Sequence, residues 1–229
     1  MTVSFVGAAS AEATSLTLPA HQAGDLILIF AGRTGAATVP TIPAGWRFAS
    51  QTTQSGTTPP AIGCSVGWKI ATSSAETSGT WTGATMLLAV VIRDDANLLV
   101  IGGIGKTNTS GTTTVNYPVL GLNSTQSVQA MRWTSSYILL PVIVTSNTSD
   151  IDTPPTASTS KIVSLAGTAA IEMAIHRTNA EVASWASTNY TANESVRYAT
   201  WAIEILDTGY AKTAAASFRP VNIRGGADQ

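Results

Sequence analysis

The chain is poor in the residue types that form cross-links, charged surfaces and membrane spans. It contains one cysteine, Cys64, so no internal disulfide can form. Only 11% of its 229 residues are charged, and the 12 basic and 13 acidic residues form no run of either sign. Because this pattern would not neutralise a phosphate backbone, we expect no nucleic-acid partner. The longest apolar runs, at 86–92 and 138–144, fall short of the roughly 20 residues of a membrane helix, so we expect no membrane span.

The scarcity of charge leaves most of the surface neutral, because soluble domains average roughly 25% charged residues. Serine and threonine together make up about a quarter of the chain, and threonine suits the half-exposed surface of a strand. A neutral surface is typical of proteins whose faces contact neighbouring subunits, since charged groups are depleted at interface cores. It is equally typical of an isolated extracellular domain with a hydroxylated surface, and the composition favours neither alternative.

Strand-like patterns recur along the whole chain. Apolar residues alternate with small or polar ones at 62–70 and 171–176, which is the period of a strand with one buried face. Many such segments alternate with glycine and proline turns, as in sandwiches and barrels. We therefore expect an all-β fold, an antiparallel β-sandwich that is jelly-roll-like. It would contain at most one or two short helices, at 125–133 and, with a weaker pattern, at 180–186.

The run LILIF at 26–30 predicts the most buried strand. It follows a Gly-Asp turn and is too short for a buried helix, so we expect an inner strand covered on both faces. The loop after it ends at Trp46, whose ring we expect to cover the edge of the core. No convincing boundary divides the chain, so residues 1–210 are expected to form a single β-sandwich domain. Residues 211–229 lack periodicity and predict an extended C-terminal arm.

No motif in the sequence calls for catalysis. The segment GGIGKT at 102–107 lacks the first glycine of a phosphate-binding P-loop. Glu172 and His176 share one face of a predicted strand, and their spacing favours an exposed polar face over a hydrogen-bonded pair. Cys64 lies in the apolar half of an alternating strand and is expected to be a small buried side chain. We therefore expect a protein that is not an enzyme and that carries no cofactor.

Two aspartates, Asp150 and Asp152, are the candidates for a metal site. Their carboxylates are suitable calcium ligands, but such sites usually need six or more oxygens, and the surrounding loop supplies mainly threonine and proline. We therefore assign no metal ligands, and a calcium ion near these two residues stays an open alternative.

Six tryptophans allow carbohydrate binding to be considered, because sugar sites use exposed aromatic rings. Trp68 and Trp201 lie within strand patterns and are expected in the core. Trp81, Trp133 and Trp185 lie in polar surroundings, so they are the candidates for contact with a glycan or a partner. A carbohydrate-binding or adhesive module that recognises cell-surface glycans is therefore the alternative function.

Four segments carry a resemblance to a known group of proteins: AGDLILIFAGRTG at 23–35, PAGW at 43–46, CSVGWKIAT at 64–72 and SGTWTGATMLLAVVIR at 78–93. In this order they resemble a β-sandwich domain of bacteriophage virion proteins, in which a Gly-Asp-Leu-Leu-like strand precedes a loop ending in Pro-x-Gly-Trp. The match covers roughly residues 1–90, and the rest shares only a rhythm of strands. The resemblance implies a structural or attachment role on the capsid surface, in the tail or in a fibre, and it brings no catalytic residues.

These observations together predict a non-enzymatic structural protein at the virion surface, assembled in the host cytoplasm. Its expected partners are other virion proteins and copies of itself, as a homo-oligomer such as a trimer, with host-surface glycans as further candidates. Neutral strand faces and the C-terminal arm would form the contacts between subunits. The candidate contact residues in the arm are Phe218, Arg219, Pro220, Ile223 and Arg224.

Overall fold

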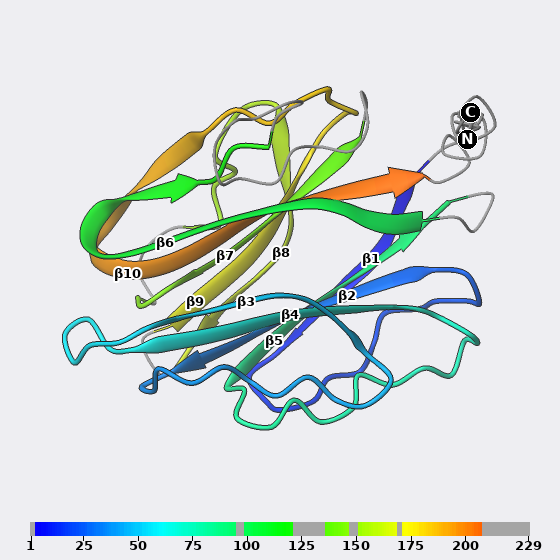
Figure 1. Cartoon of the computed structure of the whole chain (residues 1–229), viewed down its shortest axis with the longest axis horizontal. Coiled ribbons are helices and arrows are strands. Elements are labelled where there is room, and N and C mark those ends of the chain that lie inside the picture. The colour runs from blue at the N-terminus through cyan, green and yellow to red at the C-terminus, as the bar shows by residue number, and fades with distance from the viewer. Residues whose placement is uncertain (1–2, 95–98, 121–135, 147–150, 169–170, 208–229) are drawn as a thin grey trace, which may run out of the picture.

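The computed structural model describes residues 3–94, 99–120, 136–146, 151–168 and 171–207. These residues form two antiparallel five-stranded sheets and no helix, which confirms the all-β sandwich (Figure 1). A helix at 180–186 is wrong, because Val182 and Trp185 form isolated β-bridges instead; the segment 125–133 lies outside the described residues. The strands are β1 (Ser4–Ala11), β2 (Leu26–Thr34), β3 (Arg47–Gln54), β4 (Ile62–Ile70), β5 (Met86–Arg93), β6 (Leu99–Tyr117), β7 (Tyr137–Val144), β8 (Thr159–Gly167), β9 (Ile171–Thr178) and β10 (Thr188–Asp207).

The two sheets share one strand order. The first sheet is ordered β1-β5-β2-β4-β3 and the second β6-β10-β7-β9-β8, so each strand of the second sheet corresponds to the strand five places earlier. The sheets face each other with β1 against β8 and β3 against β6, as a two-fold rotation between the halves requires. The chain therefore uses one five-strand plan twice. The finer jelly-roll connectivity is not confirmed, since among the strands of the described ranges β5 and β6 are the only consecutive pair that belongs to different sheets.

β2 is the central strand of the first sheet and contains LILIF. It pairs with β4 on one side and β5 on the other, and residues 26–31 are inaccessible to solvent. The prediction of an inner strand covered on both faces is confirmed. β7 has the same place in the second sheet, between β9 and β10, and is buried from Ile138 onward.

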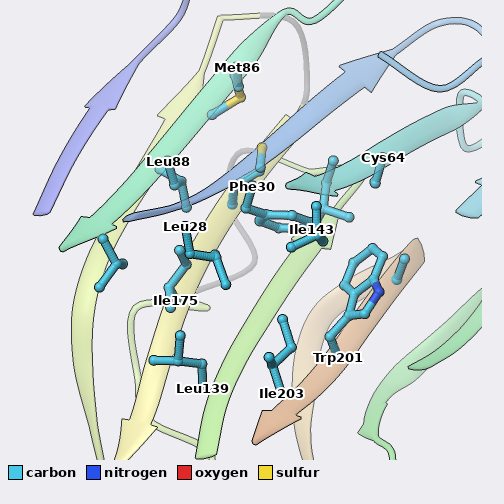
Figure 2. Close-up of a cluster of buried hydrophobic side chains, with 14 of the residues drawn as sticks. Leu28, Phe30, Cys64, Met86, Leu88, Leu139, Ile143, Ile175, Trp201 and Ile203 are labelled. Atoms are coloured by element: carbon cyan, nitrogen blue, oxygen red, sulfur yellow. The ribbon is translucent and has the colours of Figure 1, made fainter. Parts of the chain in front are cut away.

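An apolar core fills the space between the two sheets (Figure 2). Phe30 of β2 packs edge-to-face against Trp201 of β10, with ring centroids 4.9 Å apart. The indole N–H of Trp201 donates to Ser50 Oγ of β3 at 3.1 Å, so the core also contains a hydrogen bond between the sheets. Cys64 is fully buried here, as expected, and burial raises the pKa of its thiol.

Loops cover the outer face of the first sheet. They run along the underside of the lower sheet in Figure 1 and form an apolar layer with the outward-facing side chains of β2 and β5. Trp46 and Trp81 lie in this layer with ring centroids 5.6 Å apart. Trp46, which we expected at the edge of the core, is half-buried and packs in this outer layer. The apolar residues of this layer include Leu16, Ile29, Ala31, Ile42, Trp46, Trp81, Leu87 and Ala89.

Strands of the second sheet cover their own outer face. β6 and β10 bend together at the left of Figure 1 and turn back over the sheet. The bend includes Gly111, whose φ of 69° is left-handed, and a register shift of β10 between Thr191 and Val196. Residues 112–117 and 188–196, which we call the folded ribbon, therefore pack over the outward-facing side chains of β7 and β9.

Candidate functional site

The structure corrects two of the candidate contact residues. The side chain of Trp81 is 0% exposed and that of Trp185 is 6% exposed, so the expectation that their rings lie on the surface is wrong. Each ring belongs to the layer outside its sheet. The backbone N–H of Trp81 donates to the carbonyl of Thr14, just after β1, and that of Trp185 donates to the carbonyl of Leu120, just after β6. The two residues are therefore equivalent core positions of the two halves, and Trp133 lies outside the described residues.

A groove lies instead beside Trp68, a residue that the alternating pattern places in the core. Its ring packs against the core but is half-buried, because Trp68 stands near the end of β4. The groove has a volume of about 500 Å³, within the usual range of ligand sites. Its lining consists of Gly45, Arg47, Trp68, Lys69, Ile70, Thr72 and Glu76.

The turn PAGW shapes one wall of the groove. The backbone N–H of Trp46 donates to the carbonyl of Pro43 at 3.2 Å, and Gly45 has a φ of 84°, which is the third position of a type II turn. A side chain at Gly45 would be strained, and the space around its absent Cβ is open. The turn leads directly into β3, where Arg47 pairs with Trp68 of β4. The Gly-Trp signal of the sequence therefore positions a cation beside a half-exposed indole.

A network of hydrogen bonds fixes the acidic rim of the groove. Glu76 pairs with Lys69 and accepts the backbone N–H and the hydroxyl of Thr72, both at 2.8 Å. The ion pair with Lys69, followed by the two bonds from Thr72, lowers the pKa of Glu76 to about 2. The backbone N–H of Glu76 also donates to His21 Nε2 at 3.1 Å. Glu76 therefore stays ionised and holds the loop 72–76 in place.

Two cations of the groove lie over indole rings. The Arg47 guanidinium carbon is 5.1 Å from the centroid of the Trp68 ring, and Lys69 Nζ is 5.6 Å from the centroid of the Trp46 ring. Such contacts between a cation and an aromatic ring are favourable. Lys69 is neutralised by Glu76, so Arg47 supplies the net charge of the lining. The arrangement provides an apolar floor, a hydroxyl and one positive charge, which is the chemistry of a binding site.

The remaining motifs fall into strands or buried contacts. GGIGKT lies within β6, where Gly103 N–H donates to the Glu204 carboxylate at 2.7 Å, so the segment is not the loop of a nucleotide site. Glu172 and His176 are both buried, and the expected exposed polar face is wrong because the folded ribbon covers it. Tyr117 Oη of the ribbon lies 3.4 Å from His176 Nδ1. Burial lowers the pKa of His176 to about 4, against weaker opposing contacts with the backbone of residues 151 and 152.

Asp152 pairs with Lys161 at 3.1 Å on the surface, and a hydrogen bond from Ser164 is the largest factor that lowers its pKa. Asp150 lies outside the described residues. Within the described ranges, no three side chains of the metal-ligating types come together. The arm residues Phe218, Arg219, Pro220, Ile223 and Arg224 also lie outside the described part.

Comparison of the chain with protein-family models, with curated proteins and with solved structures finds no match. The part of the chain that the structure describes has no helix that could cross a bilayer.

Proposed function

We propose that the chain is a non-enzymatic structural protein of a bacteriophage virion surface that assembles with copies of itself through the edge strand β6. The observation that carries the proposal is the sequence of this edge. Residues 107–117 read TNTSGTTTVNY and contain no charge, and within the described residues they pair only with β10. An edge strand without charged side chains is a template for pairing with another strand.

The arrangement of the sandwich supports an edge rather than a face as the contact. The outer faces of both sheets are covered by other segments of the same chain. The neutral strand faces that we expected to form contacts between subunits are therefore not exposed. The edge of β3 meets the first part of β6, because Lys106 Nζ donates to the carbonyl of Gln51 at 2.8 Å and Asn108 Nδ2 donates to Thr52 Oγ1 at 2.6 Å. The part of the β6 edge that we propose for assembly therefore lies beyond Asn108. β8 carries Lys161, and β1, which is also uncharged, is 8 residues long against the 19 of β6. Along β6, Thr113 and Asn116 are exposed and neutral.

Charge placed on this edge tests the proposal. The double variant Thr113→Lys with Asn116→Lys adds two positive charges to each copy, so paired edges would repel each other. We expect wild-type protein to sediment as a homo-oligomer and the variant as a monomer with the same circular dichroism spectrum. The matched control is Thr77→Lys with Thr80→Lys, two exposed positions of the loop 71–85, which should leave the oligomer intact. A wild-type chain that stays monomeric at all concentrations contradicts the proposal.

The place of the chain in a particle is tested separately. The resemblance of residues 23–93 to virion sandwiches supports this part of the proposal. We expect mass spectrometry of purified particles to detect the chain in many copies, and antibody labelling to place it at the surface. Absence from the particle would reject the virion role and leave the self-assembly through β6 standing.

Removal of residues 211–229 tests the arm, which we expect to contribute to contacts between subunits.

Carbohydrate binding is the second candidate function. The groove beside Trp68 favours it, because a half-exposed indole, the Thr72 hydroxyl and charged groups line one hollow of about 500 Å³. Of the three tryptophans expected to contact a glycan, the two that the structure describes are buried, so the groove replaces them as the candidate sugar site.

A further inference from the structure

We infer that the groove beside Trp68 recognises a carboxylate-bearing saccharide and that Arg47 binds its carboxylate. This inference rests on carbohydrate binding, the second candidate function, and not on assembly through β6. It assigns the ligand class from the charge and geometry of the lining.

Arg47 is the cation that is free to meet an anion. Its guanidinium makes no hydrogen bond or ion pair with another described residue, whereas the Lys69 ammonium is paired with Glu76. Its guanidinium carbon lies 5.1 Å from the Trp68 ring centroid, so contact with the indole restricts the position of the guanidinium before a ligand arrives. An oriented guanidinium binds a carboxylate through two parallel N–H···O bonds. A neutral sugar would leave this charge without a partner.

The other walls of the groove suit a sugar ring. Ile70 and the uncovered part of Trp68 offer apolar surface, and Thr72 offers a hydroxyl at the rim. Gly45 leaves open space beside Arg47, where a ring attached to the carboxylate can lie. The hydrogen bonds from Thr72 and to His21 fix the rim before binding, which reduces the entropy lost on association. A small acidic peptide shares the carboxylate but lacks the hydroxylated ring.

Calorimetric titration with a matched pair of probes tests the inference. Trigalacturonate carries carboxylates, and its methyl ester has the same rings without charge. We expect wild-type protein to bind trigalacturonate with an affinity at least roughly tenfold higher than its affinity for the ester, because hydrogen bonds to charged groups are stronger than those between neutral groups. Binding should weaken with salt. Triglutamate is a peptide that carries carboxylates without sugar rings, and it should bind more weakly than trigalacturonate.

Variants at two stacked arginines localise the effect. Arg47→Ala should weaken trigalacturonate binding about tenfold or more, and Arg47→Lys should give an intermediate loss because it keeps the charge without the fork. The control is Arg177→Ala, since Arg177 also lies over an aromatic ring, 4.3 Å from the centroid of Phe5, but outside the groove. This control should bind as wild type does. Arg47 is exposed, so thermal unfolding should be unchanged in its variants.

Three results overturn the inference in distinguishable ways. Equal binding of trigalacturonate and its ester would show that the sugar ring and not the carboxylate is recognised, and carbohydrate binding would stand. No binding of either probe would reject both the inference and carbohydrate binding, while assembly through β6 would be untouched. Binding that survives Arg47→Ala, or triglutamate that binds as well as trigalacturonate, would reject the assignment of this ligand and this residue.

Discussion

The layer outside the first sheet is apolar, whereas the layer outside the second sheet encloses titratable side chains. Both halves have the same strand order, and both fix the layer with a tryptophan just before the fifth strand. In the first half loops supply the cover, and Trp81 belongs to one apolar cluster with Ile29 and Leu87. In the second half the folded ribbon supplies it and brings Tyr117 onto His176. The same strand order is therefore compatible with an apolar outer layer or with one that contains polar groups. We expect the two layers to respond differently to mutation and to acid.

The largest expected effect comes from the two equivalent tryptophans. Trp81→Ala should destabilise the fold by about 4 kcal/mol, because it removes a fully buried ring and leaves a cavity. Trp185→Ala should cost somewhat less, about 3 kcal/mol, since its ring is slightly exposed. Urea unfolding of both variants gives these free energies.

Replacement of each tryptophan by phenylalanine isolates the contribution of the indole N–H. Trp81 Nε1 donates to the carbonyl of Ser78 at 3.0 Å, whereas Trp185 Nε1 is buried without an acceptor among the described residues. Loss of the indole N–H should therefore cost about 1 kcal/mol more at position 81 than at position 185. An equal cost at both positions would show that the two layers are not distinguished by this bond.

Mild acid should weaken the second half first. The unfolded chain protonates His176 with a pKa near 6.5 and the folded chain with a pKa of about 4, because burial disfavours the imidazolium. The unfolded state therefore takes up the proton first, and stability that is present above pH 6.5 falls by about 3 kcal/mol between pH 6.5 and pH 4. Of the charged groups that act on the imidazole, Lys161 opposes protonation and Asp152 favours it.

Urea unfolding across this pH range compares wild type with His176→Gln, which cannot take up the proton. The free energy of unfolding of the wild type should fall between pH 6.5 and pH 4, and the difference between wild type and His176→Gln should account for this fall. Hydrogen exchange should show the folded ribbon opening before β2 does. A variant with the same pH dependence as wild type would remove His176 from the explanation.

A smaller effect is expected from the two ion pairs. Asp25 is buried just before β2 and accepts Arg93 Nε and Nη2, both at 2.7 Å. Burial raises the pKa of Asp25, but the bonds from Arg93 and from the Gln22 N–H outweigh it, so the pKa is lowered. The stability that ionised Asp25 contributes is therefore present above about pH 4 and is lost as the pH falls below this value. The stability that depends on neutral His176 is lost at higher pH than this.

Asp25→Asn should cost about 2 kcal/mol, because the buried bonds lose their charge. Asp152→Asn is the matched change in the second half, and it should cost under about 0.5 kcal/mol, since the side chains of Lys161 and Asp152 are 39% and 50% exposed. Thermal or urea unfolding at neutral pH measures both variants. Equal losses would contradict the distinction between a buried and an exposed pair.

Local sequence patterns predicted the elements whose environment is set within the strand itself. LILIF is apolar at every position, which requires cover on both faces, and the structure supplies β4 and β5 at its sides and apolar layers above and below. The alternation at 62–70 likewise predicted the inward direction of Cys64. The Gly-Asp turn was visible, but the pairing of Asp25 with Arg93 was not, because the partner lies on another strand.

Features that depend on distant segments could not be predicted in this way. Glu172 and His176 alternate like an exposed face, yet the ribbon that buries them begins far away at Thr112. Trp81 and Trp185 lie among polar neighbours in sequence and are buried by the layers that cross them. The groove depends on the register of β3 with β4, which places Arg47 opposite Trp68. A cation that directly follows a Pro-x-Gly-Trp turn is the one local signal that could have indicated it.

The central proposal, that copies assemble through β6, is tested most directly by hydrogen exchange of the amides of residues 107–117 at low and high protein concentration. We predict that exchange along this edge slows as the concentration rises, that the edges β1 and β8 do not change, and that the protection disappears in the Thr113→Lys with Asn116→Lys variant. Exchange along β6 that is the same at every concentration would contradict the account.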